Sequence, residues 1–135
     1  MAWIKPVTNR TAADVAARNA LGTLRASDLN RIEGNLAVLG DELGLSLDTV
    51  TTWASAGLPT VSDYERILSN ASAVVAALPV PGGVPAMPTM PLNSYTQFNT
   101  LESIILAVQT QYLALQDAKI FAGEGFYAGD VIGVI

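Results

Sequence analysis

The chain has 135 residues, of which half are apolar and 14% are charged, and its formal net charge is −5. This length allows one domain with a modest core, and the composition excludes a disordered polyelectrolyte. The seven basic residues are scattered, which together with the acidic net charge argues against nucleic-acid binding. No segment reaches about 18 uninterrupted apolar residues, so no membrane span is predicted.

The residue types restrict the function further. The sequence contains no cysteine and no histidine, so we expect no disulfide, no thiolate or imidazole metal site and no cofactor. Residues 1–6 lack the features of a signal peptide. Without disulfides the sequence does not determine the compartment, and synthesis in a cytoplasm is the default expectation. The high apolar content has two explanations: helices rich in Ala, Val and Leu, or apolar surface covered by partner chains, which we favour.

A short helix is predicted over about residues 12–20. It follows an extended or irregular segment that contains Trp3 and is broken by Pro6. Thr11 and Asp14 have the spacing of a capping box at the start of this helix. Gly22 is placed beyond its end as a left-handed stop.

The first main helix is predicted over about residues 28–43. Ser27 is its expected N-cap, Asp28 adds negative charge at its positive end, and Gly44 ends it. Gly34 and Gly40 lie off its apolar face, either at a close approach to a neighbour or as tolerated surface glycines. The apolar residues recur at spacings of 3, 4, 3 and 4, which places them on one face: Leu29, Ile32, Leu36, Leu39 and Leu43.

Residues 45–53 are β-branched and partly alternating, which predicts either a short strand or an extended crossover. Pro59 precedes the second main helix, for which Ser62 is the expected N-cap. Trp53 with Pro59 repeats the earlier pair of Trp3 with Pro6, and we interpret each pair as a lid on helix ends. The apolar face of the second helix comprises Tyr64, Ile67, Ala71, Val74 and Leu78.

Residues 79–91 hold five of the seven prolines. Proline fixes φ and lacks an N–H, so this segment is predicted to be a semi-extended crossover, with a polyproline ligand as the alternative. The third main helix is predicted over about residues 95–119. Its apolar face comprises Phe98, Leu101, Ile105, Val108, Tyr112 and Leu115.

The last segment, residues 121–135, differs in character from the rest of the chain. It is rich in glycine and aromatic residues, and four of its last five residues are apolar side chains. Because free termini are usually polar, we expect this segment to be extended and to dock on a partner, for example as a strand added to a sheet edge. The docking residues are Phe126, Tyr127, Val131, Ile132, Val134 and Ile135.

An internal repeat organises the chain. Residues 62–70 match residues 27–35 after a shift of 35, and after a further shift of 34, residues 98–102 match residues 29–33. Self-similarity at a fixed period indicates duplicated helical units. The predicted fold class is therefore mostly α, a three-helix bundle-like domain over residues 1–120 with units of about 1–44, 45–92 and 93–120. Whether the helices pack within one chain or between copies stays open.

Two arginines and two asparagines recur at equivalent places: Arg31 with Arg66, and Asn35 with Asn70. Each arginine either ties one unit to a carboxylate or carbonyl of the next, or belongs to an exposed polar stripe. The early-helix acids are explained by the helix dipole alone, and no acid, base or nucleophile constellation is present. No enzymatic activity is predicted. These acids are Asp28, Glu33, Asp63, Glu65 and Glu102.

The ordered set of motifs resembles a module of structural proteins in bacteriophages and prophages of Gram-positive bacteria, commonly encoded near tail-fibre or baseplate genes. The resemblance covers nearly the whole chain. Its pieces are NRTAADV at residues 9–15, ASDLNRIEGN at 26–35, Trp53, LPT at 58–60, ERILSN at 65–70, NTLE at 99–102 and FAGEGFYAGD at 121–130.

The resemblance implies a virion component, made in the bacterial cytoplasm and assembled in multiple copies with itself and with other virion proteins. It carries over no catalytic, cofactor or metal residue. Such modules are often followed by further domains, whereas this sequence stops at Ile135. We therefore expect a small tail-associated connector or adaptor rather than a complete host-binding fibre. The alternatives are a capsid decoration or head-fibre base, and a soluble helical adaptor that binds a partner peptide.

Overall fold

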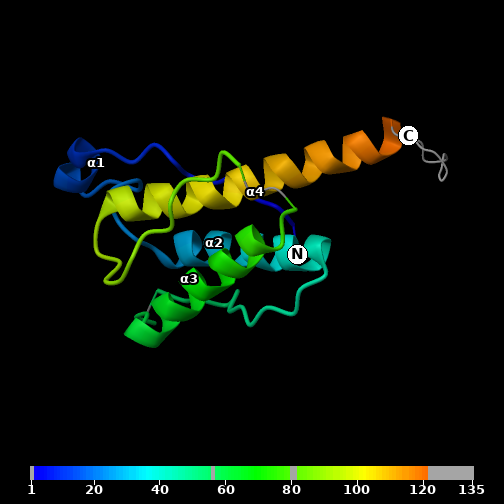
Figure 1. The fold of residues 1–135 in the computed structure, drawn as a ribbon. Coiled ribbons are helices and arrows are strands. Elements are labelled where there is room, and N and C mark those ends of the chain that lie inside the picture. The colour runs from blue at the N-terminus through cyan, green and yellow to red at the C-terminus, as the bar shows by residue number, and fades with distance from the viewer. Residues whose placement is uncertain (1, 56, 80–81, 122–135) are drawn as a thin grey trace.

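The computed structural model describes residues 2–55, 57–79 and 82–121, and the side chains of this last range as far as residue 118. Within these ranges the chain is mostly helical and contains no strand, which confirms the predicted mostly-α class. Residues 45–53 are an extended crossover. The helices are α1 (Ala12–Ala17), α2 (Ala26–Leu43), α3 (Val61–Ala76) and α4 (Tyr95–Phe121) (Figure 1).

The three long helices run in the same direction (Figure 1). Each of them is preceded by a non-helical segment that returns along the bundle in the opposite direction, and the described parts of these segments are residues 2–10, 44–55 with 57–60, and 77–79 with 82–94. We call the end where α2, α3 and α4 begin the helix-start end, and the opposite end the helix-stop end. Residues 11–24, which contain α1 and project at the helix-start end, are called the hook.

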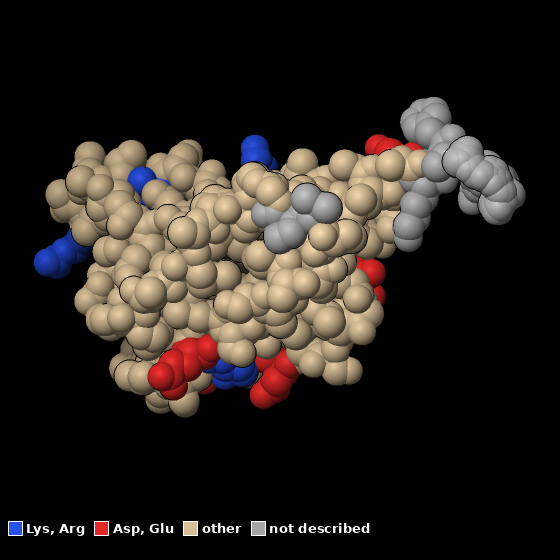
Figure 2. Space-filling model, viewed as in Figure 1, with Lys and Arg blue, Asp and Glu red and all other residues tan. Residues whose placement is uncertain are grey.

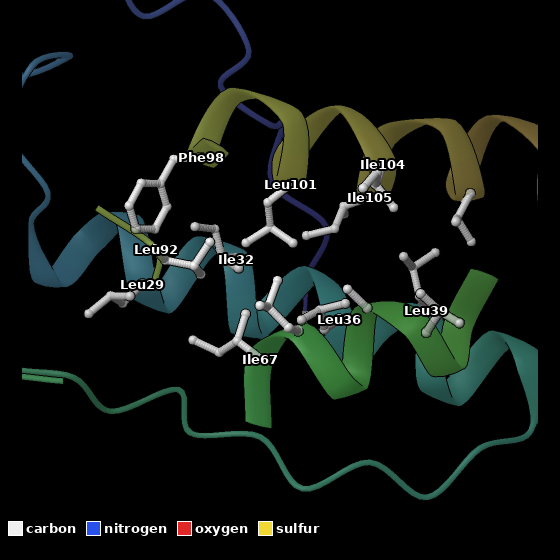
Figure 3. Packing of buried hydrophobic residues seen from close by; sticks show 14 of the residues in the cluster. Leu29, Ile32, Leu36, Leu39, Ile67, Leu92, Phe98, Leu101, Ile104 and Ile105 are labelled. Atoms are coloured by element: carbon white, nitrogen blue, oxygen red, sulfur yellow. The ribbon is translucent and has the colours of Figure 1, made fainter. Parts of the chain in front are cut away.

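One apolar core joins α2, α3 and α4, and each of these helices contacts the other two. The core is built largely from the faces with 3- and 4-residue spacing, because such a face turns one continuous apolar side toward the same axis. Figure 3 shows these side chains meeting between the ribbons. The buried members from the three long helices are Leu29, Ile32, Leu36, Leu39, Ile67, Leu68, Ala71, Val74, Phe98, Leu101, Ile104, Ile105 and Val108, with Leu78 and Leu92 from the crossovers.

The edges of the predicted faces differ from the core in three ways. Leu43 and Tyr64 are only partly buried and pack against the core from its rim. Tyr112 is half-buried, and Leu115 is 38% exposed, so its assignment to the core is wrong. The reason is length: α4 has 27 residues against 18 in α2 and 16 in α3, so neither of these two helices reaches far enough to cover its last turns.

Two helix starts lie earlier than predicted, and neither serine is the cap. α2 begins after Arg25 and α3 after Thr60. At each start an aspartate at the third helical position accepts from the backbone N–H of the cap residue, Asp28 from Arg25 at 2.8 Å and Asp63 from Thr60 at 2.7 Å. This bond fixes the helix start two residues before the predicted serine, and at α3 the Thr60 hydroxyl returns it by accepting from the backbone N–H of Asp63.

The hook also ends differently from the prediction. α1 stops at Ala17 and Arg18 takes the left-handed conformation, with φ of 53°. Gly22 lies further on, where a Cβ atom would come within 2.0 Å of the carbonyl oxygen of Asp14. Gly22 is therefore required by a close backbone approach and not as the helix stop.

Close approach also accounts for one of the two glycines inside α2. Gly40 is buried, and an added Cβ would lie 2.9 Å from the Leu47 side chain of the returning crossover.

The predicted docking residues of the C-terminal segment lie outside the described residues. No helix among the described residues is long and apolar enough to cross a membrane.

Candidate functional site

Two fully buried glutamates dominate the polar interior of the protein. Glu33 of α2 and Glu102 of α4 both have 0% exposure. A buried carboxylate is costly unless it is paired and its lone pairs accept hydrogen bonds. The surroundings of these two side chains therefore show what holds the three helices in place.

Glu102 is held by two arginines and one backbone N–H. Arg31 of α2 reaches it with a two-point grip, Nε to Oε1 at 2.8 Å and Nη2 to Oε2 at 2.7 Å. Arg10 donates from Nη2 to Oε2 at 2.6 Å, and the backbone N–H of Val7 donates to Oε1 at 3.0 Å. A planar guanidinium matches a carboxylate in this geometry. Glu102 thus ties α4 to α2 and to the first returning segment.

Glu33 is held in the same manner by different parts of the chain. Arg66 of α3 donates from Nη2 to Oε2 at 2.7 Å. The indole N–H of Trp53 donates to the same oxygen at 2.6 Å, and the backbone N–H of Val50 donates to Oε1 at 3.0 Å. Glu33 thus ties α2 to α3 and to the second returning segment.

Each arginine also contacts an aspartate of its own helix, three residues earlier. Arg31 Nη2 lies 2.9 Å from Asp28, and Arg66 Nη1 lies 2.8 Å from Asp63. Burial by itself lowers the pKa of both guanidinium groups, but their carboxylate partners outweigh it and the pKa of each is raised. The pKa of Asp63 is lowered by hydrogen bonds from the Thr60 backbone and then from Arg66.

Asparagine side chains fix the returning segments at regular points along the helices. Asn30 accepts from the backbone N–H of Trp53 at 2.8 Å and donates to its carbonyl at 3.0 Å. Asn99 does the same for Arg10, at 3.1 and 2.9 Å. An amide carries both a donor and an acceptor, so one asparagine satisfies both backbone groups of an extended residue.

The asparagines that recur in the sequence have the related task one turn later. Asn35 of α2 pairs with both backbone groups of Ile4, at 2.9 and 2.7 Å. Asn70 of α3 donates to the carbonyl of Asp48 at 2.8 Å. Arg31 and Arg66 join repeated units, as one of the two sequence interpretations proposed, whereas Asn35 and Asn70 fix each helix to the returning segment of its own unit. They are not members of an exposed stripe.

The sequence interpretation missed the two glutamates. It attributed Glu33 and Glu102 to the helix dipole, whereas both are buried centres of an ionic network. A signal was present, because Glu33 and Asn30 recur as Glu102 and Asn99 in the third unit. Arg10, which approaches Glu102 from the first returning segment, lies outside the helical repeat and left no such signal.

The network is repeated twice around the bundle and not a third time. Arg66 reaches from α3 to Glu33 of α2, and Arg31 reaches from α2 to Glu102 of α4. A third link would join the residue equivalent to Arg31 in α4 to the residue equivalent to Glu33 in α3. Those positions hold Thr100 and Leu68. Neither Thr100 nor Leu68 carries a charge, so the absence of this third link leaves no buried arginine or glutamate without a counterion at these positions.

We call each of these arrangements, in which an arginine of one helix binds a buried glutamate of another, a clasp. Each buried carboxylate accepts at both oxygens, and it is charge-paired with a guanidinium group that remains protonated at any physiological pH. No group of three metal-ligating side chains occurs in the part of the chain that the structure describes. The carboxylates are committed to joining helices, and a proton-transfer role is not supported by their geometry.

A hollow beside the hook is the other concave feature of interest. It has a volume of about 270 Å³ and lies where the hook meets the starts of α3 and α4. The ring of Tyr64 packs edge-on against that of Phe98 in its wall, with centroids 6.2 Å apart. Burial raises the pKa of Tyr64.

No family model, curated protein or solved structure matches the chain.

Proposed function

We propose that this protein is a non-enzymatic structural component of a bacteriophage particle, tail-associated, which assembles in multiple copies and with other virion proteins. The sequence resemblance to phage structural modules supports the assignment to a phage particle, and the geometry of the buried ionic groups supports a structural role. The two parts rest on separate observations and are tested separately.

The observation that carries the structural role is the use of the polar interior. Glu33 and Glu102 are the two fully buried acids among the described residues, and every hydrogen bond that they accept joins one repeated unit to another. Active sites commonly keep a polar group available to a substrate, with a pKa tuned for its task. Here the ionic groups serve to hold three helices and two returning segments in one rigid arrangement.

The second supporting observation is the exposed apolar surface. Large apolar side chains remain open to solvent on a chain that is half apolar in composition. Exposed apolar residues that gather in patches mark surfaces for association. This supports a building block whose faces are covered by partners in the finished particle.

Mass spectrometry of purified particles tests the proposal. Particles of the phage that encodes this chain are purified by density gradient and compared with the unbound fraction of the same lysate. We expect peptides of the chain in stoichiometric amount in intact particles, and immunogold labelling at the tail. Its exclusive presence in the unbound fraction would contradict the proposal and favour the soluble adaptor. Labelling of the capsid would instead favour the decoration protein.

A further inference from the structure

The exposed large apolar side chains gather mainly at the two ends of the bundle. At the helix-start end the hook and the entry to α3 expose several of them, and at the helix-stop end the projecting turns of α4 expose two more. Outside these two regions only Ile4 and Leu106 are comparably exposed among the described residues. The members at the helix-start end are Val15, Leu24, Leu58 and Val61, and those at the helix-stop end are Leu113 and Leu115.

The helix-start end is hollowed, whereas the helix-stop end projects. Two hollows, of about 270 and 390 Å³, flank Leu24, which lines both. At the other end, α4 extends beyond α2 and α3 (Figure 1). Val108 is the last buried residue among the described side chains of α4. The 27 residues of α4 span about 40 Å at 1.5 Å per residue. One end therefore has recesses lined by apolar side chains, and the other has an apolar projection.

Burial within this chain does not explain why the hook is ordered, and a partner that covers it would. α1 has six residues and none of them is buried. A helix of this length is unstable alone in water. It is held open by local bonds, in which Asn19 donates to Asp14 and accepts from the backbone N–H groups of Leu21 and Gly22. These bonds keep an exposed apolar wall beside the recess without covering it.

The two ends also differ in their electrostatics, through the helix dipoles and the acids at the helix-stop end. Because α2, α3 and α4 are parallel, their dipoles add, with the negative ends together at the helix-stop end (Figure 1). Neither α2 nor α3 has a basic residue in its last turn, and Asp41 and Glu42 lie in the last turn of α2. At the helix-start end, Arg18 and Arg25 are exposed. Figure 2 shows basic side chains projecting at the hook, and acidic ones both near the helix-stop end and at the start of α3. Glu65, in the second turn of α3, is exposed.

From these observations we propose that copies of this chain associate head to tail, with the projecting end of α4 of one copy seated in the recesses beside the hook of the next. This inference rests on the multi-copy assembly proposed above and names its contact. The negative character of the helix-stop end disfavours a tail-to-tail contact, which would bring several negative helix ends together, whereas the helix-start end carries the positive ends of the dipoles with Arg18 and Arg25. A contact between two different surfaces of one chain builds rings or open rows and not closed dimers.

A mixing experiment tests the contact. The stop-end variant is L113E/L115E and the start-end variant is L24E/R25E, and all four side chains are exposed, so the fold is expected to persist. Each variant is blocked at one end and intact at the other. The measurement is molar mass by sedimentation velocity and light scattering over a range of concentrations, with circular dichroism to establish folding.

For the wild-type chain we expect a mass that rises with concentration beyond that of a dimer. Each variant alone is expected to remain at the 14.1 kDa of one chain, because charge placed in the contact weakens it by about tenfold or more. A mixture of the two variants is expected to form a one-to-one dimer and nothing larger. The matched control L106E changes an exposed leucine of the same helix within the length of the bundle, and wild-type association is expected for it.

Three outcomes would overturn the inference. Self-association of the start-end variant, with the stop-end variant monomeric, would show a tail-to-tail contact. If both variants associate as strongly as the wild-type chain does, neither end is used. If the wild-type chain is itself monomeric, the chain has no self-contact, and residues 122–135 or another protein would then cover the projection. The mixing result is separate from the particle result: chain found in particles without a mixed dimer removes this contact and leaves the proposed function standing.

Discussion

Arg31 and Arg66 occupy equivalent positions in successive helices, and each grips a buried glutamate that belongs to a different helix. Arg31 binds Glu102 of α4, and Arg66 binds Glu33 of α2. Each guanidinium also contacts the aspartate three residues earlier in its own helix. The same local sequence therefore performs the same task twice, and the repeat in the sequence becomes a repeat in the tertiary contacts.

Replacement of Glu33 by glutamine is expected to destabilise the protein by about 3 kcal/mol or more, since removal of one partner of a buried ion pair leaves the other charge without compensation. Arg66 would keep only Asp63 as a counterion. The new amide N–H₂ would face either the backbone N–H of Val50, or both Arg66 and the Trp53 indole, depending on its orientation. Urea denaturation followed by circular dichroism measures the change. Glu65→Gln, on the exposed side of α3, is the control, with an effect within about 0.5 kcal/mol. Equal effects for the two variants would contradict the clasp role of Glu33.

Asn35→Ala tests how the first returning segment is fixed. The amide of Asn35 satisfies both backbone groups of Ile4, and the loss of a buried partner costs about 1–3 kcal/mol. We expect faster hydrogen exchange at the Ile4 N–H, measured by NMR, together with a lower unfolding midpoint. Asn19→Ala is the matched control, because Asn19 bonds only within the hook. Unchanged protection of Ile4 in the Asn35 variant would be incompatible with this role.

The missing third link can be installed. Leu68→Glu alone places a charge at a nearly buried position and is expected to cost about 3 kcal/mol or more. Thr100→Arg alone changes a partly exposed position and is expected to lie within about 0.5 kcal/mol of wild type. In the double variant we expect at least about 1 kcal/mol of the loss to be recovered, as a coupling between the two sites in a double-mutant cycle. Simple additivity would mean that these positions do not face each other as the two existing pairs do.

Acid pH should weaken the start of α3. The pKa of Asp63 is lowered by hydrogen bonds from the Thr60 backbone, from Arg66 and from the Thr60 hydroxyl. Its native-state pKa therefore lies below its unfolded value of 3.8, so its contribution to stability is complete above about pH 4 and is lost as the pH falls through the native value. We expect the free energy of unfolding to decline below about pH 4, with a shallower decline in Asp63→Asn. Parallel declines for the two proteins would show that Asp63 contributes nothing to the pH dependence.

Much of the helical framework follows from local patterns in the sequence. The core residues of α2, such as Leu36 and Leu39, are fixed by a 3- and 4-residue spacing that leaves only one face apolar. Gly44 ends α2 in the left-handed conformation, as its position after the last apolar residue indicates. Helix starts were misplaced by two residues because Ser27 and Ser62 resemble caps, whereas the aspartates that follow them decide the register.

The ionic network could be predicted only in part because its partners are brought together by the tertiary fold. Arg31 and Glu102 are 71 residues apart, and no local pattern relates them. The dipole explanation of Glu102 was sufficient for an exposed residue, and nothing in the sequence states that this position is buried. The exposure of Leu115 has the same origin, since it depends on where α2 and α3 stop and not on the spacing within α4.

The most direct test of the central claim, that buried arginine–glutamate clasps join the repeated units, is a double-mutant cycle on Arg31 and Glu102. The variants are Arg31→Met, Glu102→Gln and the two combined, with the free energy of unfolding in urea measured for each. The account predicts a coupling energy of about 1.5–3 kcal/mol, with each single variant much less stable than wild type. A coupling energy near zero would contradict it, because Arg31 and Glu102 would then contribute to stability independently of each other.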